Sequence, residues 1–458
     1  MCGIFGYLGP QNNASQMAID GLKNLEYRGY DSWGVACKNE QGDLLLEKHV
    51  GKISEADDLK PEMLKETNHL AIGHSRWATH GGVTDQNAHP HLSHSGNIAL
   101  VHNGIVENYV ELREELKKDG FEFKSETDTE TIVHLIEKYT NEIGFEEGVK
   151  KAVKRLEGRY GFLAIHKDEE KMIAARTGSP LIVGVGPLDN EYFLGSDVPA
   201  FYKHTKRVMY LDDEQMVVID KEGAKFFSTK SDEQIEKRIV ELTFDIQSAE
   251  KGDYAHFMLK EIYEQSETVA AAMRGRIDRD NATSVFGGLN LTPSQLQNIN
   301  RIVLTGCGTS WHAALVGEYL IEEFAQLPVE VEYASELRYR NPPLDKGTLL
   351  FAITQSGETA DTLAALREMK RKGHSTLAIC NAIGSTIATE ADGGIYLHAG
   401  PEIGVASTKA FTSQCAVLAM LALYFGRLRH MSFEQGIAFI DALEQLPSLI
   451  SRVLQTES

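Results

Sequence analysis

The second residue of the chain, Cys2, can act as a nucleophile that carries its own base. A small residue after the initiator methionine permits removal of that methionine, and this frees the α-amine of Cys2. An α-amine has a pKa of about 7.7–8.0, so its neutral form can accept the thiol proton near physiological pH. The resulting thiolate can attack an amide carbonyl. A chance cysteine at position 2 is the alternative, because many cysteines are inert.

Two turns rich in glycine and hydroxyl residues can bind an anion. They are VLTGCGTSWHAAL at 303–315 and LFAITQSGETADTL at 350–363, and each lies where a buried strand gives way to a helix. Backbone N–H groups at a helix start favour negative charge, and small hydroxyl side chains add donors. The dinucleotide fingerprint fails because Trp311 stands at its third glycine position, and no Walker sequence with its lysine is present. The two turns therefore favour a compact phosphate monoester.

Three histidines superficially resemble metal ligands. His89, His91 and His94 lie close together in a polar segment. Their spacing matches no standard zinc pattern. The sequence therefore predicts a polar loop here and no bound metal.

The elements that must position Cys2 are mixed strands and helices over residues 1–240. An apolar start predicts a strand and turn at 2–9, and helical spacing of apolar residues predicts helices at 15–27 and 128–139. Asp128 stands near the start of the second helix. The other expected strands are 70–73, 98–102, 162–165, 181–185 and 216–219. Strand clusters interleaved with helices predict a layered α+β domain.

Residues 301–454 follow a regular strand–helix alternation. This pattern predicts a doubly wound parallel sheet. The expected strands are 301–305, 329–333, 348–353, 376–379 and 394–397, with closing helices at 405–427 and 432–454. The periodicity fades between 241 and 256, which predicts a linker, and a helix is expected from 257 to 276.

The composition is that of a globular protein with an acidic surface. The 458 residues suggest about three domains, and the 42% hydrophobic and 24% charged fractions are ordinary. A net charge of −20 without a run of basic residues disfavours nucleic-acid binding. Five scattered cysteines fit a reducing compartment. No secretory signal is recognisable, and the longest apolar stretch, 415–425, is too short to span a bilayer, so we expect a cytoplasmic protein.

Six motifs in the first half resemble the class II glutamine amidotransferases, whose glutaminase domain is an N-terminal-nucleophile hydrolase. The motifs are MCGIFGYLG at 1–9, LEYRGYDSWG at 25–34, HSRWATHG at 74–81, NAHPH at 87–91, VHNGIVEN at 101–108 and SETDTE at 125–130. Their order and spacing make the resemblance specific. One departure is Trp33, where the family usually has a small residue.

The resemblance implies roles for individual residues. Cys2 matches the nucleophile that attacks the glutamine side-chain amide, giving a thioester and ammonia. Asn103 and Gly104 match the oxyanion hole, since a side-chain amide and a backbone N–H are suitable donors for a developing oxyanion. The implied glutamine-binding residues are Arg28, Arg76, Trp77, Thr79, His80 and Asp128.

Two of these residues match groups that hold the ends of the substrate. Arg76 matches the residue that pairs with the α-carboxylate, a task suited to a guanidinium fork. Asp128 matches the group that holds the α-ammonium. The ordinary alternatives are a surface ion pair for Arg76 and a helix cap for Asp128. Tyr30 and Arg28 belong to a loop that the family uses to shape the site.

The two anion-binding turns, with EIGVASTKAF at 402–411, resemble the sugar isomerase (SIS) domain of the glucosamine-6-phosphate synthases. KEIYEQ at 260–265 and SELRYRNPP at 335–343 add to the match. The implied sugar-phosphate-binding residues are Thr309, Ser310, Thr354, Gln355, Ser356, Thr359, Val405 and Ser407. Thr354 replaces the usual serine and keeps a hydroxyl. Cys307 is expected to be a small packed residue.

The resemblances imply two folded parts. Residues 1–240 are expected to form an α+β N-terminal-nucleophile hydrolase domain with αββα layers, and 291–430 an α/β doubly wound, parallel-sheet SIS domain. Residues 241–290 are expected to be a linker and helices, and 431–458 a helix leading to a second SIS subdomain that this sequence lacks. In the family that subdomain and the tail carry a glutamate and a lysine used on the sugar, and a histidine lent by the neighbouring subunit. Lys409 is not assigned the role of that lysine.

The implied enzyme makes glucosamine 6-phosphate and glutamate from fructose 6-phosphate and glutamine, with ammonia passing through an internal channel. The product feeds amino-sugar and cell-wall precursor synthesis. No metal, organic cofactor, nucleic acid or membrane is implied, and the full-length form is expected to be a homodimer. Two alternatives stay open. A glutaminase with a sugar-phosphate-binding domain would release glutamate without amino sugar, and a non-catalytic sugar-phosphate-binding regulator would release none.

Overall fold

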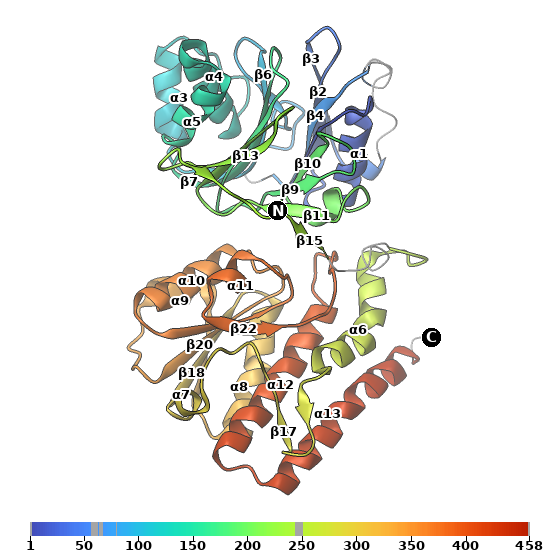
Figure 1. The fold of residues 1–458 in the computed structure, drawn as a ribbon, viewed down its shortest axis with the longest axis vertical. Coiled ribbons are helices and arrows are strands. Elements are labelled where there is room, and N and C mark those ends of the chain that lie inside the picture. Colours follow the sequence, from blue (N-terminus) through green and yellow to red (C-terminus); the bar gives the residue numbers. More distant parts are fainter. Residues whose placement is uncertain (1, 56–62, 64–66, 79, 243–250, 457–458) are drawn as a thin grey trace. The chain divides into compact units, whose positions relative to one another are not determined.

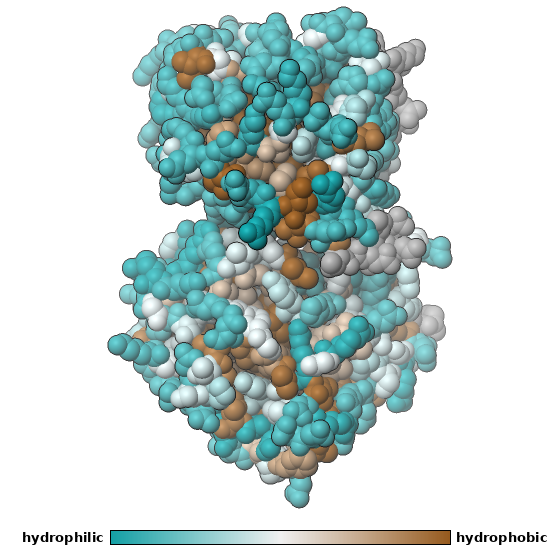
Figure 2. Space-filling view, in the orientation of Figure 1, coloured by the Kyte–Doolittle hydropathy of each residue, from teal (hydrophilic) through white to brown (hydrophobic). Residues whose placement is uncertain are grey.

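The computed structural model describes residues 2–55, 63, 67–78, 80–242 and 251–456. The chain divides into two compact units, Met1–Ile246 and Gln247–Ser458 (Figure 1). The visible face of each unit is mostly hydrophilic (Figure 2). The predicted four-part division of the chain stays a prediction, and residues 243–250 of the expected linker lie outside the described residues.

The first unit contains an eight-stranded antiparallel sheet in the order β15-β11-β9-β10-β1-β4-β2-β3. Its strands are β1 (Gly3–Leu8), β2 (Ser32–Lys38), β3 (Leu44–Val50), β4 (Leu70–Arg76), β9 (Ile182–Val185), β10 (Tyr192–Gly195), β11 (Arg207–Tyr210) and β15 (Val240–Glu241). Strand β4 lies between β1 and β2, and Gly3 pairs with Ser75. This register brings the start of the chain beside the end of β4.

A second antiparallel sheet of seven strands has the order β14-β13-β12-β8-β7-β6-β5. Its strands are β5 (His91–Leu92), β6 (Ile98–Val106), β7 (Gly158–His166), β8 (Met172–Thr177), β12 (Gln215–Asp220), β13 (Gly223–Ser228) and β14 (Gln234–Ile235). Strands β6 and β7 pair along their full length. Residues 101–106 of the VHNGIVEN segment therefore lie in a strand that is paired on both sides, with β7 and with β5.

Helices cover the outer face of each sheet, so the first unit has four layers (Figure 1). The helices are α1 (Ala14–Asn24), α3 (Tyr109–Lys118), α4 (Thr129–Ile143) and α5 (Phe145–Val153). Helix α1 packs on β1, β2 and β4, whereas α4 packs on β5 and β6, and α5 packs on β8. This is the αββα layering that the family resemblance implied.

Strand β1 shows how the two sheets are joined. Phe5 and Tyr7 pack in the core that contains α1, while Ile4 and Leu8 pack in the core between the sheets. This is the alternation of a strand with both faces covered. Gly6 also faces the second sheet, where a Cβ atom would collide with the Leu163 side chain. The sheets therefore approach closely next to the start of the chain.

The second unit is built on a five-stranded sheet with the order β19-β18-β20-β21-β22. Its strands are β18 (Arg301–Gly306), β19 (Val329–Tyr333), β20 (Thr348–Thr354), β21 (Ser375–Cys380) and β22 (Gly393–Tyr396), and every pair is parallel. In chain order this is 2-1-3-4-5, which confirms the predicted doubly wound sheet. The order reverses between β18 and β20, and α/β proteins bind ligands at such a switch point.

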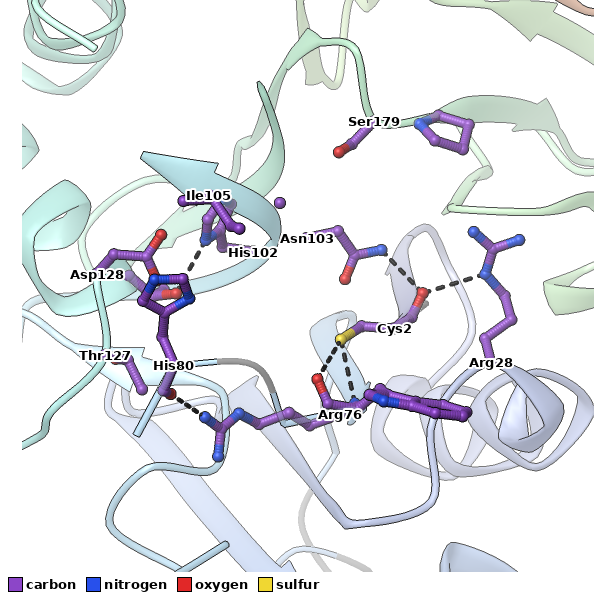
Figure 3. Close-up of a pocket in the computed structure, with 14 residues that line it drawn as sticks. Cys2, Arg28, Arg76, His80, His102, Asn103, Ile105, Thr127, Asp128 and Ser179 are labelled. Atoms are coloured by element: carbon purple, nitrogen blue, oxygen red, sulfur yellow. Dashed lines mark hydrogen bonds between the residues drawn. The ribbon is translucent and has the colours of Figure 1, made fainter. Parts of the chain in front are cut away.

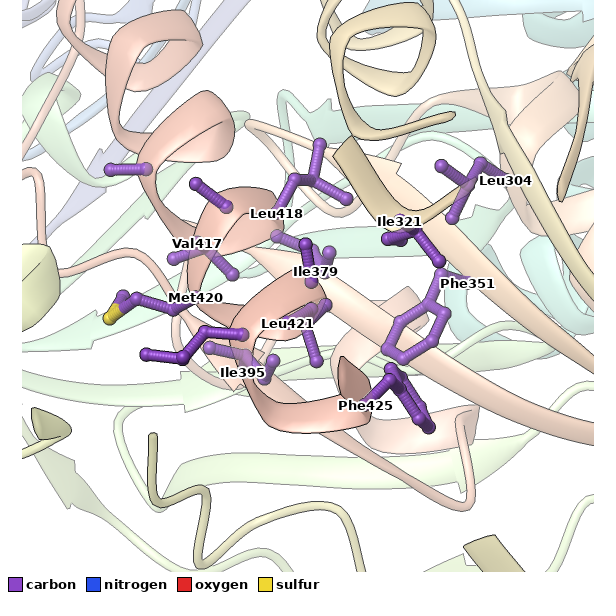
Figure 4. Close-up of a cluster of buried hydrophobic side chains, with 14 of the residues drawn as sticks. Leu304, Ile321, Phe351, Ile379, Ile395, Val417, Leu418, Met420, Leu421 and Phe425 are labelled. Atoms are coloured by element: carbon purple, nitrogen blue, oxygen red, sulfur yellow. The ribbon is translucent and has the colours of Figure 1, made fainter. Parts of the chain in front are cut away.

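Helices cover both faces of this parallel sheet. One face carries α9 (Ala334–Arg340), α10 (Ala360–Arg371) and α11 (Thr386–Glu390), and the other carries α6 (Phe257–Met273), α8 (Thr309–Ala325) and α12 (Lys409–Arg429). Helix α13 (Phe433–Leu454) packs on α6 and α12. Figure 4 shows the larger core, in which Phe351 of β20 and Ile379 of β21 meet Leu421 of α12.

Helix α12 is long and apolar enough to count as a candidate membrane span by length and composition. However, 67% of its most apolar window is buried inside the unit. It packs on α8 and α6 and fills the core below the sheet. Such burial is typical of the central helix of a globular unit.

Several helix boundaries differ from the sequence-based expectation: the helix expected at 257–276 ends at Met273, and the one expected at 128–139 extends to Ile143. The helix expected from residue 405 begins at Lys409, because the Glu402 carboxylate accepts the N–H groups of Thr408 and Ala410 and holds the preceding loop. The helix expected to reach residue 27 ends at Asn24, and a short 3-10 turn, Glu26–Arg28, follows it. That turn directs the Arg28 side chain toward the start of β1.

Candidate active site

Cys2 lies at the entry to β1, beside the end of β4, and lines a cavity of about 350 Å³. Its Sγ accepts a hydrogen bond from the Trp77 N–H at 3.1 Å and lies 3.5 Å from the Trp77 carbonyl oxygen (Figure 3). A cavity of this size is within the range of small-ligand sites in proteins.

The main chain of Cys2 is held from two sides. Its carbonyl oxygen accepts hydrogen bonds from Arg28 Nε at 3.1 Å and from Asn103 Nδ2 at 3.0 Å (Figure 3). Arg28 is buried and is anchored in turn by Asp197 at 3.0 Å, which also accepts the Tyr27 hydroxyl at 2.7 Å. The main chain of Cys2 is thus held by Arg28, from the 3-10 turn that follows α1, and by Asn103, from β6 of the second sheet.

Burial raises the pKa of the Cys2 thiol above its ordinary value. The Trp77 N–H and the positive charges of Arg76 and Arg28 act in the opposite direction but do not outweigh the loss of hydration. The sulfur is therefore a neutral thiol at physiological pH. A base must remove its proton before it can attack a carbonyl.

Asn103 and Gly104 lie side by side in β6 and line the same cavity. Gly104 has a φ of +123°, and a Cβ atom there would collide with the Arg159 carbonyl oxygen. Only glycine fits this strand position without moving the backbone. Asn103 Nδ2 donates to the Cys2 main-chain carbonyl oxygen, so an amide donor of the kind that an oxyanion hole uses lies beside the residue that carries the thiol.

Arg76 is buried at the end of β4 and lines the cavity. Its guanidinium donates to main-chain carbonyls of the following loop, to Gly82 at 3.1 Å and to His80. These carbonyls are neutral acceptors, so the positive charge of the guanidinium is not neutralised by them at the cavity wall. This geometry differs from the surface ion pair considered as its ordinary alternative.

Asp128 precedes α4 without capping it. The helix has no side-chain cap hydrogen bond, and an Asp128 carboxylate oxygen instead accepts the Val106 N–H of β6 at 2.9 Å. Glu130 holds the segment before Asp128, since its carboxylate accepts the N–H groups of Lys124 and Ser125 at 2.8 and 2.7 Å. Asp128 is therefore fixed at the pocket wall, opposite in charge to Arg76.

The other predicted glutamine-binding residues are placed as follows. Trp77 is 38% exposed, and its ring packs against that of Tyr30 at 5.4 Å. His80 lines the cavity and lies edge-on to Tyr109. Thr79 lies outside the described residues. Trp33 points away from the cavity into the core with α1, against His49.

Six cavity-lining residues were not singled out from the sequence. They are His102, Ile105, Thr127, Thr129, Ser179 and Pro180. The first four fall inside the motifs quoted above, so their position in those motifs could have identified them as candidate site residues. Ser179 and Pro180 lie between β8 and β9, and only the pairing of distant strands brings them to the pocket.

The histidines near position 90 are part of the interior rather than a polar loop. His89 and His91 are buried, and the His89 ring stacks on that of His74 with centroids 4.2 Å apart. Among the residues that the structure describes, no group of three or more His, Cys, Asp or Glu side chains is placed to hold a metal ion. The polar loop predicted for His89 and His91 is wrong, because His91 belongs to strand β5 and His89 is buried just before it, whereas His94 is exposed in the turn after β5.

In the second unit, the two anion-binding turns follow adjacent parallel strands. The turn after β18 leads into α8, and the turn after β20 leads into α10. Gly308 immediately precedes α8 with a φ of +59°, a conformation that favours glycine. The N-terminal ends of two helices therefore meet at the switch point of the sheet, where their N–H groups favour an anion.

Hydroxyl groups of the turns are held by local hydrogen bonds. Thr354 Oγ1 accepts the Gly357 N–H at 3.1 Å and lies 3.4 Å from Thr359 Oγ1. Ser356 Oγ accepts the Glu358 N–H at 3.2 Å, and Ser310 Oγ accepts the amide of Gln414 from α12 at 3.0 Å. The Gln355 main-chain carbonyl accepts the N–H groups after β21. Thr309 is the first residue of α8.

The segment before α12 is organised by carboxylates. Ser407 donates to Glu402 at 2.7 Å, and Val405 is 70% exposed. Lys409 is buried and pairs with Glu264 of α6 at 2.7 Å. The sugar contacts expected of Val405 and Ser407 stay predictions.

Two family profiles match the chain. The profile described as a glutamine amidotransferase domain matches residues 74–203, and the profile described as a SIS domain matches residues 295–424. The predicted fold class is confirmed: a class II glutamine amidotransferase domain with αββα layers precedes a doubly wound SIS domain.

Curated relatives match the chain over almost its full length. A glutamine--fructose-6-phosphate aminotransferase [isomerizing] from Chlorobaculum tepidum is 46% identical and covers 99% of this chain and 74% of that protein. A protein of the same name from Thermus thermophilus has the same identity and coverage. The solved C-terminal domain of glucosamine-fructose-6-phosphate aminotransferase from Francisella tularensis is 36% identical over 44% of this chain and 56% of that chain, with a TM-score of 0.42.

Replacement of Glu130 by Gln tests how the Asp128 segment is held. Burial tends to raise the pKa of Glu130, but hydrogen bonds from His134, Lys124 and Ser125 outweigh it and lower the pKa to about 2. A depressed carboxyl pKa stabilises the fold above the unfolded pKa, and this stabilisation is lost as the pH falls through the folded pKa. We expect Glu130→Gln to lower the free energy of unfolding by about 2 kcal/mol at neutral pH, in urea titrations.

The difference between the wild type and Glu130→Gln should shrink as the pH falls from about 4.5 toward 2. Glu111, an exposed carboxylate of α3, provides the control, and Glu111→Gln should change the free energy of unfolding by less than about 0.5 kcal/mol. A pH-independent effect of Glu130→Gln would contradict this assignment.

Proposed function

Because this chain belongs to the glutamine–fructose-6-phosphate aminotransferase (isomerizing) family, we propose that it takes ammonia from glutamine at Cys2 and transfers it to fructose 6-phosphate. The chain is a glutamine-dependent amidotransferase. The observation that carries the residue-level proposal is one cavity that Cys2, Arg76, Asn103 and Asp128 line together.

The first step of the proposed mechanism is attack by Cys2 on the side-chain carbonyl carbon of glutamine. After removal of Met1, the neutral α-amine of Cys2 takes the thiol proton, and Sγ forms a bond to the carbonyl carbon. The carbonyl oxygen becomes an oxyanion and accepts hydrogen bonds from Asn103 Nδ2 and the Gly104 N–H. Donors that are already oriented make this type of stabilisation large.

The second step releases ammonia and regenerates the enzyme. The α-ammonium of Cys2 returns its proton to the leaving nitrogen, the C–N bond breaks, and a thioester remains. Water then adds to the thioester carbonyl, the C–S bond breaks, and glutamate leaves. The sum is one glutamine and one water converted to one glutamate and one ammonia, and no cofactor enters the balance.

Arg76 and Asp128 are proposed to select an α-amino acid. The Arg76 guanidinium suits the α-carboxylate and the Asp128 carboxylate suits the α-ammonium. Both side chains are buried at the cavity wall, so their charges act with little screening by water. Trp77 and His80 complete the rim, and Arg28 acts through the main chain of Cys2.

The second unit is proposed to bind the phosphate of fructose 6-phosphate. The turns that carry Ser310 and Thr354 end adjacent strands at the switch point, and two helices begin there. The N–H groups and hydroxyls of these turns suit a compact phosphate. Thr309, Gln355, Ser356 and Thr359 belong to the same turns, and Val405 and Ser407 are proposed to approach the sugar.

The proposed reaction takes place in the cytoplasm. All five cysteines are free thiols, which fits a reducing compartment. The homodimer implied by the family resemblance stays a prediction.

Loss of the Cys2 thiol should abolish glutamate release. We expect Cys2→Ala to lower the rate by at least about 10³-fold, because no other thiol lies in the cavity. The rate of the wild type should rise with pH through the α-amine pKa of about 7.7–8.0, since only the neutral amine is a base. Cys415→Ala, on α12, should release glutamate at the wild-type rate. Intact mass should show Met1 removed, and a fully active preparation that retains Met1 would contradict the amine's role.

The position of the Gly104 N–H, the proposed oxyanion donor, should depend on the absence of a side chain at residue 104. Gly104→Ala forces the backbone away from Arg159, so we expect kcat for glutamine hydrolysis to fall by about 10²-fold or more. Gly287→Ala is the control, because a Cβ atom there meets nothing within 4 Å and the residue does not line the Cys2 cavity. Equal activity of the two variants would contradict the placement of the oxyanion at Gly104.

Nitrogen transfer can be followed with glutamine labelled with ¹⁵N in its side-chain amide. We expect the label in glucosamine 6-phosphate when fructose 6-phosphate is present. Ser310→Ala and Thr354→Val should each raise the KM for fructose 6-phosphate by about 5- to 30-fold, because each removes a hydrogen bond from a hydroxyl to the charged phosphate. Ser375→Ala, at the opposite edge of the sheet, should leave this KM unchanged. Glutamate release without label in amino sugar would instead favour a glutaminase with a sugar-phosphate-binding domain.

A further inference from the structure

His74 lies directly behind the cavity, although it does not line it. In β4, Leu70 and Ile72 face the core between the two sheets, and the alternation of the strand places His74 on the same face. The imidazole is fully buried. Arg76, the next residue on that face, already reaches the cavity. Along this face of β4, His74 is therefore the side chain that comes directly before the cavity-lining residue Arg76.

The His74 ring donates one shared hydrogen bond. Its Nε2 lies 2.9 Å from the His102 main-chain oxygen and 2.9 Å from Asn103 Oδ1. A carbonyl oxygen can only accept, so Nε2 must carry the hydrogen. Burial lowers the pKa of His74 to about 3, so the ring is neutral at physiological pH. The two carbonyl acceptors thus select a single tautomer of the ring.

This hydrogen bond decides which way the Asn103 amide faces. The oxygen and nitrogen of an asparagine amide have nearly the same shape, so hydrogen bonds determine its orientation. With Oδ1 held by His74, Nδ2 faces Cys2 and donates to the Cys2 carbonyl at 3.0 Å. If the Asn103 amide were flipped, its Oδ1 would lie against the Cys2 carbonyl oxygen, and its Nδ2 hydrogens would lie against the Nε2–H of His74. Each buried group left unpaired in this way costs about 1–3 kcal/mol.

The His74 ring is itself held from behind. It stacks on His89 with ring centroids 4.2 Å apart. His89 Nε2 lies 2.7 Å from the Thr129 hydroxyl, and the same hydroxyl lies 2.9 Å from His102 Nδ1. Burial lowers the pKa values of His89 and His102, so this group of rings adds no charge behind the oxyanion. Thr129 begins α4, and the rings are thereby tied to the helix that follows Asp128.

We propose that His74 is a positioning residue for glutamine hydrolysis, whose Nε2–H holds the Asn103 amide with its nitrogen toward the oxyanion. The inference rests on the glutaminase function proposed above. His74 contacts neither the cavity nor Cys2, so its effect passes through Asn103. One hydrogen of Asn103 Nδ2 goes to the Cys2 carbonyl, and the second is then directed at the developing oxyanion.

A matched pair of amide variants tests this inference. The side-chain nitrogen of Gln extends about as far as Nε2 of histidine, whereas Asn is one carbon shorter and ends near the position of Nδ1. We expect His74→Asn to lower kcat for glutamine hydrolysis by about 10- to 100-fold, and His74→Gln to stay within about threefold of the wild type. The KM for glutamine should change by less than about twofold in both variants, because Arg76 and Asp128 are untouched.

Three readouts separate positioning from a general structural defect. The rate at which iodoacetamide alkylates Cys2 should be the same in the wild type and both variants, since alkylation needs no oxyanion hole. Glutamate γ-semialdehyde forms a tetrahedral adduct with a thiol, and its affinity should fall in His74→Asn by the same factor as kcat. In an Asn103→Ala background, His74→Asn should have no further effect on kcat.

The outcomes distinguish this inference from the function on which it rests. A wild-type protein that releases no glutamate would contradict the proposed glutaminase. An active wild type with unchanged kcat in His74→Asn, slower alkylation of Cys2 in that variant, or an additive effect with Asn103→Ala would each overturn the role of His74. A measurement that needs no folded variant is the ¹⁵N spectrum of labelled histidines. His74 should show the neutral Nε2–H tautomer from about pH 6 to 9, and any other form would overturn the inference.

Discussion

The carbonyl oxygen of Cys2 is the point where the two sheets of the first unit are joined at the pocket. Arg28 reaches it from the 3-10 turn after α1, and Asn103 reaches it from the second sheet. The close approach of the sheets at Gly6 makes this bridge possible, because no side chain separates β1 from the strand opposite. A nucleophile at the very start of a chain would otherwise be free to move, since chain termini are seldom ordered unless they are tied down.

Burial gives the pocket its electrostatic character. It raises the pKa of the Cys2 thiol and lowers the pKa values of His74, His89 and His102, so the sulfur and the rings behind it are all neutral. A neutral thiol among neutral rings is stable, but it is not a nucleophile. The mechanism proposed above therefore takes its proton acceptor from the α-amine of Cys2 after removal of Met1.

In the second unit, a parallel sheet brings the groups of the two anion-binding turns together. Adjacent parallel strands end at one edge, so the pairing of β18 with β20 brings the N–H groups and hydroxyls of the two following turns together. The Ser310 hydroxyl accepts a hydrogen bond from Gln414, which leaves its hydrogen free to point elsewhere. The core helix α12 thus supports the turn as well as filling the space below the sheet.

The sequence by itself determined the two architectures and the position of the chemistry along the chain. The motif at Cys2 and the glycine and hydroxyl turns are local signals, because each depends on residues that are neighbours in the chain. The sequence could not decide that Asp128 bonds to β6 rather than capping α4, that His89 is interior, or that Ser179 reaches the pocket. Nor could it assign the orientation of Asn103, which depends on His74 from another sheet. These features come from pairing between distant strands, and only the packing of the two sheets sets the distances on which they depend.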